Sequence, residues 1–186
     1  MSVRPSTPVR RRFLAAVGGA IAAGLAGCAS DGGPAADGAL DEPASIPSDA
    51  ACPVCQMVPA DYPDWNAQAV HEDGQRAFFD TSGCMLAYYV EPGEFADADA
   101  PVAGVWVTDF ETRETIDGLT AHYALETDPG RVDDPMMVNP APFADRADAV
   151  AYVDAVDYLT TDDVVGVEAF DRELAERYRG RFLEDG

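Results

Sequence analysis

Two stretches of the chain follow the same pattern, and this internal similarity constrains the fold more than any other feature of the sequence. Phe79 precedes the run C-M-L-A-Y-Y-V that begins at Cys84, and Phe143 precedes the run D-A-V-A-Y-V that begins at Asp148. The two aromatic residues, like the starts of the two runs, are 64 positions apart. In each copy an extended segment leads to the aromatic residue, and a capped helix ending in Ala-Tyr-apolar follows. Two copies at this long period do not suit a solenoid. The sequence therefore predicts an α+β fold with a duplicated β-β-α type unit.

Hydrophobic periodicity and turn residues locate the elements of these units. Two extended segments, 65–71 and 76–79, flank Asp73-Gly74, which is typical of a β-hairpin. Asp80 or Thr81 is suited to cap the helix that follows. In chain order we expect strands at 65–71, 76–79, 102–109, 114–116 and 123–126, and helices at 82–90 and 145–156.

The first 27 residues have the features of a targeting segment. Three arginines at 10–12 precede Phe13-Leu14 in the twin-arginine pattern R-R-x-F-L, and an apolar run of 15 residues starts at Phe13. This run is shorter than the roughly 20 residues that a membrane-spanning helix needs. It ends at L-A-G-C, the lipoprotein signal-peptidase pattern, in which Cys28 is the lipidated residue. We therefore expect a twin-arginine lipoprotein signal peptide at 1–27 and a lipid anchor to the extracytoplasmic face of the cell membrane.

The composition changes after Cys28, before the folded part begins. Residues 29–51 contain no aromatic side chain and are rich in Ala, Gly, Pro, Ser and Asp. Such a stretch cannot bury enough apolar surface to fold. We expect the lipidated cysteine and a flexible tether at 28–51, a folded domain at 52–167, and an acidic C-terminal helix or tail at 168–186.

The chain is strongly acidic, with 34 acidic residues, 12 basic residues that are all arginine, and a formal net charge of -22. Removal of the signal peptide takes away four arginines and no acidic residue, so the net charge deepens to -26. A surface of this sign repels phosphates, which excludes nucleic acid as a partner. We favour a salt-adapted, halophilic exterior, because concentrated salt screens the self-repulsion. An acidic surface for one basic partner is the alternative.

Three cysteines remain for the folded domain once Cys28 is assigned to lipid, and this odd count leaves at least one thiol unpaired. The run C-P-V-C-Q-M, from Cys52, places Cys55 and Met57 two residues apart. In an extended segment, side chains at this spacing lie on the same face. Thiolate and thioether are soft ligands that select Cu(I) over hard cations. Zinc fits less well, because the two histidines of the chain lack a ligand spacing.

Other sulfur atoms leave several interpretations open. Met136-Met137 lies in a proline-rich loop, where methionine is hard to explain as a core residue. Cys84, at the start of a helix, is more typical of packing than of metal binding. Cys52 and Cys55 also suit a C-x-x-C redox disulfide, although no thioredoxin-like βαβ pattern surrounds them. A structural disulfide from Cys52 to Cys55 or Cys84 stays open as well. The chain has no nucleophile paired with a base, no phosphate loop and no distinct carboxylate pair, so we do not expect an enzyme.

Taken in order, these motifs resemble those of one family. The run C-P-V-C-Q-M-V-P-A-D-Y-P-D-W-N-A-Q, from Cys52, is similar to the opening of NosL-type lipoproteins, the copper chaperones associated with nitrous oxide reductase. The similarity continues through D-G-x-x-x-F-F-D, G-C-M-L-A-Y-Y, W-V-T-D-F and P-M, and then through P-F and D-A-V-A-Y-V, to about Val156. It covers most of the expected folded domain and agrees with the lipoprotein signal.

The resemblance implies a membrane-anchored protein that binds Cu(I) and delivers it during denitrification. The implied recipient is nitrous oxide reductase or its copper-site assembly machinery. The resemblance also implies two related halves, similar to the organomercurial lyase accessory fold. The alternatives are a thiol redox protein that uses Cys52 and Cys55, and a non-catalytic surface-binding lipoprotein whose sulfurs belong to the core.

The resemblance also implies a set of copper ligands. The first choices are Cys55, Met57, Met136 and Met137. The second choices are Cys52, Cys84 and His122. Met137 stands where the family pattern P-M-G has a glycine, so either of the two adjacent methionines is a candidate. A site of few soft ligands favours copper transfer by ligand exchange.

Overall fold

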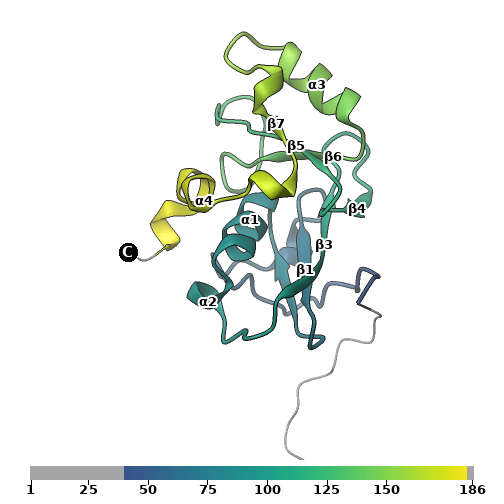
Figure 1. The fold of residues 1–186 in the computed structure, drawn as a ribbon, viewed down its shortest axis with the longest axis vertical. Coiled ribbons are helices and arrows are strands. Elements are labelled where there is room, and N and C mark those ends of the chain that lie inside the picture. Colours follow the sequence, from purple (N-terminus) through teal and green to yellow (C-terminus); the bar gives the residue numbers. More distant parts are fainter. Residues whose placement is uncertain (1–39, 184–186) are drawn as a thin grey trace, which may run out of the picture. The chain divides into compact units, whose positions relative to one another are not determined.

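The computed structural model describes residues 40–183. The expected signal peptide, the lipidated Cys28 and the first part of the expected tether lie outside these residues. Two antiparallel sheets and the helices between their strands make up the described part (Figure 1). None of the helices between residues 40 and 183 is long and apolar enough to cross a membrane.

The first sheet has four antiparallel strands in the order β2-β1-β3-β4. They are β1 (Ala67–His71), β2 (Arg76–Phe79), β3 (Val102–Thr108) and β4 (Thr115–Asp117). β1 and β2 form the expected hairpin, and its turn contains Gly74 at a φ of 86°, which glycine adopts without steric cost. The central strand β1 is buried along its whole length, so both faces of the sheet are covered there.

The second sheet has three antiparallel strands in the order β6-β5-β7. They are β5 (His122–Ala124), β6 (Ala141–Phe143) and β7 (Val164–Val165). β6 occupies part of the stretch that the sequence suggested to be a proline-rich loop, and its Pro142 lies opposite Tyr123. Proline is tolerated here because β6 is an edge strand, where one N–H of the ladder is dispensable.

The three strands of the second sheet repeat the order β2-β1-β3 of the first sheet, which has β4 in addition. In each sheet, two antiparallel strands are followed by a helix. The strand after that helix then pairs with the first of the two strands, on the side away from the second, so that β3 pairs with β1 and β7 pairs with β5. α1 (Ser82–Val90) follows β2, and α3 (Arg146–Asp154) follows β6. Phe79 and Phe143, the aromatic residues of the sequence similarity, end β2 and β6. The predicted α+β class is confirmed.

The C-terminal helix α4 (Arg172–Arg179) packs against α1 (Figure 1). Seven consecutive residues of α1, Ser82–Tyr88, are buried, which explains why this helix is apolar on nearly every face. Leu174 and Tyr178 of α4 share a hydrophobic cluster with Leu86 of α1. The acidic C-terminal stretch thus contributes a helix to the core. The remaining short helices are α2 (Pro92–Phe95), η1 (Pro59–Asp61), η2 (Thr161–Asp163), η3 (Val167–Ala169) and η4 (Gly180–Phe182).

Residues 40–51, the last part of the expected tether, lie along the first sheet. The N–H of Ala44 donates to Oε1 of Gln68 in β1 (2.8 Å), and Nε2 of Gln68 donates back to the oxygen of Ala44 (3.0 Å). Arg76 in β2 donates to the oxygen of Glu42 at 3.0 Å. These contacts hold the chain against β1 and β2 ahead of Cys52.

Candidate metal centre

Cys52, Cys55 and Met57 lie in a tight loop ahead of the first sheet. The N–H of Cys52 donates to the oxygen of Met57 (2.8 Å), and the N–H of Gln56 donates to the oxygen of Cys52 (2.9 Å). Gln56 has a φ of 67°, in the left-handed region. The expected extended segment, with Cys55 and Met57 on one face, is therefore wrong. Two backbone hydrogen bonds close the loop, so the alternation of side chains along a strand does not apply.

The loop brings two of its thiols to a third thiol and a carboxyl group. The sulfur atoms of Cys52, Cys55 and Cys84 and a carboxylate oxygen of Asp80 all lie within 4.8 Å of one another. Asp80 follows directly on β2, and Cys84 lies in the first turn of α1, so the hairpin and the helix position this half of the cluster. Cys52, Asp80 and Cys84 are fully buried, whereas Cys55 is half-buried. All three cysteines are free thiols.

One polar contact lies within the cluster, and another connects it with its surroundings. The Cys55 thiol donates to Oδ1 of Asp80 at 3.0 Å, and Nε of Arg179 donates to the sulfur of Cys84 at 3.0 Å. Within residues 40–183, the second carboxylate oxygen of Asp80 is buried without a hydrogen-bond partner. A buried acceptor in this state costs on the order of 1 to 3 kcal/mol. The cluster is therefore suited to take up a cation or a proton.

Hydrogen bonds and charges inside the cluster spread the pKa values of its thiols apart. Hydrogen bonds with Cys52 and Cys55, aided by the charge of Arg179, lower the pKa of Cys84 against the effect of burial. Hydrogen bonds with Cys55 and Cys84, together with burial, raise the pKa of Cys52. Burial and the charge on Cys84 raise the pKa of Asp80. Negative charge in the cluster is therefore most stable on the Cys84 sulfur, which faces the guanidinium.

The two adjacent methionines differ in their environment. Met136 is half-buried and packs against the hydrophobic cluster that contains Cys52 and Cys84. Met137 has a φ of 74° and a side chain that is 64% exposed. Both line a surface pocket beside α4. Met57, in the cysteine loop, is half-buried.

The histidines lie apart from the thiol cluster. His122 is in β5 of the second sheet, opposite Phe143, and lines a surface pocket with Arg146. His71 is fully buried, and its ring nitrogens contact the oxygen of Ala100 and the hydroxyl of Tyr88. Among the described residues, neither imidazole belongs to the group of potential ligands around Cys84.

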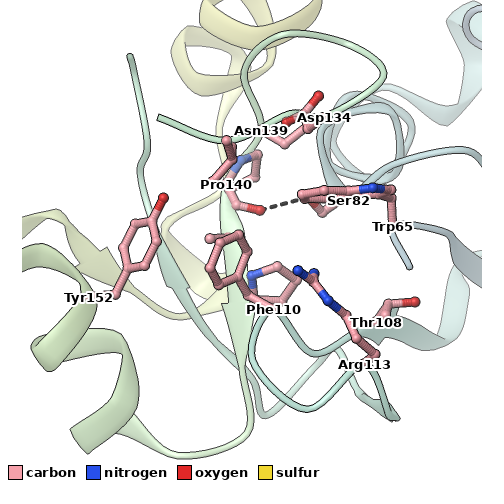
Figure 2. A pocket seen from close by; sticks show the side chains of 12 residues that line it. Trp65, Ser82, Thr108, Phe110, Arg113, Asp134, Asn139, Pro140 and Tyr152 are labelled. Carbon is pink, nitrogen blue, oxygen red and sulfur yellow. Dashed lines mark hydrogen bonds between the residues drawn. The ribbon is translucent and has the colours of Figure 1, made fainter. Parts of the chain in front are cut away.

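A small pocket near the start of α1 contains none of these sulfur ligands. Figure 2 shows its aromatic and polar walls, with Ser82 donating to the oxygen of Pro140 at 2.6 Å. Asn139, which also lines this pocket, donates to Asp134 at 2.5 Å and accepts from the N–H of Gly83 at 3.1 Å. These contacts join the methionine-bearing loop to the helix that carries Cys84.

The fold and the site define an α+β protein with a buried, sulfur-rich candidate metal centre. A NosL family model matches residues 43–160, more than half of the chain, and the chain belongs to the NosL family. Among solved structures, the copper chaperone NosL from Shewanella denitrificans has a similar fold, with a TM-score of 0.51 and 15% sequence identity. The similarity covers 62% of this chain and 87% of that chain. No curated protein matches.

Family membership confirms the resemblance found in the sequence motifs and agrees with the prediction that the chain is not an enzyme. Sequence reasoning missed two residues of the site. Asp80 had been considered only as a helix cap, although it directly follows the family motif's two phenylalanines. Arg179 carried no signal, because it lies far along the chain from the cysteines, in a helix beyond the matched residues that contains two other arginines.

Proposed function

We propose that this protein is a Cu(I) chaperone, anchored by a lipid on Cys28 to the extracytoplasmic face of the membrane. In this proposal it delivers copper to nitrous oxide reductase or to the machinery that assembles the copper sites of that enzyme. The observation that carries the proposal is the group of three thiols within 4.8 Å of one another. Membership of the NosL family and the fold shared with a copper chaperone support it.

The chemistry of the donor atoms favours Cu(I) as the cargo. Thiolate and thioether sulfur are soft, polarisable ligands, which select the soft ion Cu(I) over hard cations. In the proposed site, Cys55 and Met57 from the loop bind copper together with Met136. Met136 is preferred over Met137 because it packs against the cysteine-containing core whereas the side chain of Met137 points to solvent. Cys52 and Cys84 are additional ligands from the buried side.

Copper would leave such a site by ligand exchange. Cys55 is the half-buried member of the thiol cluster, so an incoming sulfur or imidazole meets it before the buried Cys52 and Cys84. The partner's ligand binds copper while the buried thiolates still hold it, and the chaperone's ligands then dissociate one at a time. Besides the bonds to copper, only bonds to protons change: an incoming thiol gives up its proton, and Cys52 and Cys55, whose pKa values are raised, take up protons as copper leaves.

The copper proposal is tested by anaerobic titration of the purified protein with Cu(I), in competition with a chromophoric chelator, and by native mass spectrometry. We expect one Cu(I) per chain. The double variant Cys55→Ser, Met57→Ala should bind Cu(I) more weakly by at least tenfold, because it removes two soft ligands. Met85→Leu is the matched control, since this methionine is fully buried in the core and is not assigned to the site. Unchanged Cu(I) affinity in the double variant would refute the proposed ligands.

A thiol redox function is the second candidate, and the same proximity of three free thiols favours it. In that case two protein thiols would be oxidised to a disulfide while a substrate disulfide is reduced to two thiols. This function requires no methionine. Reduction of insulin disulfides by the wild-type protein and equally by Met57→Ala would support it over copper binding.

We also propose that the two sheets descend from one duplicated unit. Their identical order of hairpin, helix and third strand supports this origin, as does the 64-residue offset between Phe79 and Phe143. Superposition of residues 67–108 on residues 122–165 tests the proposal. We expect β1, β2, α1 and β3 to match β5, β6, α3 and β7 in a single rigid superposition.

A further inference from the structure

Arg179 is a buried arginine at the end of α4, outside the residues that match the family model. Its side chain is 1% exposed, although a guanidinium keeps its charge at every accessible pH. A buried charge is stable only where hydrogen bonds and an opposite charge replace the water that it has lost. The hydrogen-bond acceptors and charges around Arg179 therefore indicate its role.

All five N–H bonds of the guanidinium have an acceptor. Nε donates to the sulfur of Cys84 at 3.0 Å. The other four donate to oxygen atoms, which are those of Thr81 Oγ1 (2.8 Å), Asn139 Oδ1, Val138 O (3.2 Å) and Tyr178 O (2.7 Å). The guanidinium thus joins α4 both to the first turn of α1 and to the loop after Met136 and Met137.

Among the described residues, the acceptors of Arg179 include no carboxylate. The four oxygen acceptors are neutral hydroxyl, amide and backbone groups, so within this part of the chain the Cys84 sulfur is the one direct acceptor that can carry a negative charge. The side chain of Asn139 joins Asp134 to Arg179 by hydrogen bonds, and the charge of Arg179 opposes the rise that burial causes in the pKa of Asp134. Within residues 40–183, the Cys84 sulfur is therefore the hydrogen-bonded contact of this cation that is able to balance its charge.

The chain also provides space for this arrangement. A side chain at Gly83 would place its Cβ 2.7 Å from Nη2 of Arg179 and 2.4 Å from Oδ1 of Asn139. A glycine at this position of α1 lets the guanidinium lie directly against the helix, next to Cys84. The position of Arg179 thus depends on the space that Gly83 leaves on α1 as well as on its own helix, α4.

We propose that Arg179 is a positioning residue of the copper site, which holds the Cys84 sulfur toward Cys52 and Cys55 and balances the charge of a third copper-bound thiolate. The proposal rests on the proposed copper function and deepens it. Cu(I) bound by three thiolates has two negative charges in excess, and the adjacent guanidinium neutralises one of them. The copper site then has three cysteine ligands, and helix α4 belongs to it.

The test compares Arg179→Met, Arg179→Lys and the wild-type protein, each as the full chain loaded with Cu(I) under anaerobic conditions. Chelator competition gives the Cu(I) affinity, and X-ray absorption gives the number of sulfur ligands. We expect Arg179→Met to bind Cu(I) roughly 10- to 100-fold more weakly, the range for residues that orient metal ligands, and to lose one sulfur ligand. Arg179→Lys should recover part of the Cu(I) affinity and of the lost sulfur coordination, because lysine keeps the positive charge. The control Arg177→Met, on the same helix with a 41% exposed side chain, should change neither.

A double-variant cycle separates positioning from a general effect on folding. If Arg179 acts through Cys84, Arg179→Met combined with Cys84→Ser should weaken Cu(I) binding no more than Cys84→Ser alone. Additive losses would overturn the proposal, as would a folded Arg179→Met protein with wild-type affinity and the same number of sulfur ligands as the wild-type protein. If Arg179→Met does not fold, Gly83→Ala, which displaces the guanidinium, and Arg179→Lys replace it in the same comparison. Failure of the wild-type protein to bind Cu(I) would instead refute the copper function itself.

Discussion

Glu126 is the buried carboxylate whose removal should destabilise the fold most clearly. It follows β5, is 1% exposed and accepts five hydrogen bonds. The donors are the backbone N–H groups of Thr127 and Asp128 (2.7 Å each), the hydroxyls of Tyr152 (2.7 Å) and Tyr158 (3.0 Å), and Nη1 of Arg131 (3.0 Å). Glu126 therefore ties the start of the methionine-bearing loop to the helix α3.

Glu126→Gln keeps the size of the side chain and removes one acceptor oxygen. The amide nitrogen would face either the two backbone N–H groups or Arg131, and neither can turn into an acceptor. An unsatisfied buried donor costs about 1 to 3 kcal/mol, and loss of a buried ion-pair partner costs about 3 to 5 kcal/mol. Because the Arg131 side chain is 16% exposed, we expect the low end of the second range, about 3 kcal/mol. For a protein of this size that lowers Tm by roughly 6 to 12 °C.

The pH dependence provides an independent check. Burial alone raises the pKa of Glu126, but the hydrogen bonds from Asp128, Tyr152 and Thr127 outweigh it, and the pKa is lowered. A lowered folded-state pKa gives stability that is present above the unfolded value of about 4.3 and is lost as the pH falls through the folded value. The gap in Tm between the wild-type protein and Glu126→Gln should therefore be full at pH 7 and shrink below about pH 4.3.

Thermal unfolding followed by circular dichroism between pH 3 and pH 8 measures both effects. Glu173→Gln, whose side chain is 85% exposed, is the control and should leave Tm within about 1 °C of the wild-type value. The reasoning is refuted if Glu126→Gln unfolds at the wild-type temperature at pH 7, or if the gap in Tm grows on acidification.

Three further variants test the site and the role of the C-terminal helix. Met136→Ala should weaken Cu(I) binding by roughly tenfold, through loss of a thioether ligand. Met137→Ala should not, and equal losses in the chelator competition would contradict the preference for Met136. Deletion of residues 161–186 should strongly destabilise the protein, because it exposes Leu86 and removes Leu174 and Tyr178 from their shared cluster. A cooperative melt at the wild-type temperature after this deletion would contradict the role of α4 in the core.

Local patterns in the sequence were sufficient for most of the elements. The turn at Gly74 predicted the β1–β2 hairpin, and the caps and apolar runs predicted α1 and α3 to within a few residues. The short strand β6 was predicted only through the internal similarity, as the extended segment that leads to Phe143, because its own alternation is interrupted by Pro142. β7 has two residues, too few for any periodicity.

The candidate site was predicted less completely, because some of its residues are far apart in the sequence. Cys55 and Met57 were found from the soft chemistry of their side chains, yet the closed conformation of their loop depends on backbone hydrogen bonds that residue spacing does not reveal. Cys84 was predicted to be a packing residue first and a copper ligand second, because a cysteine near the start of an apolar helix suits either role. Its contact with Arg179 joins residues 95 positions apart, and only the packing of α4 on α1 creates it.

The unequal burial of the three cysteines has a consequence for how copper enters and leaves the proposed site. Cys52 and Cys84 are closed off from solvent, and Cys55 gives the thiol cluster its solvent-facing side. A protein that donates copper and a protein that receives it must then both approach the site from the side of Cys55. The two cannot occupy it together, so the carrier would have to release one partner before it meets the next. Copper delivery would proceed as two separate encounters, and an excess of donor protein would slow the second.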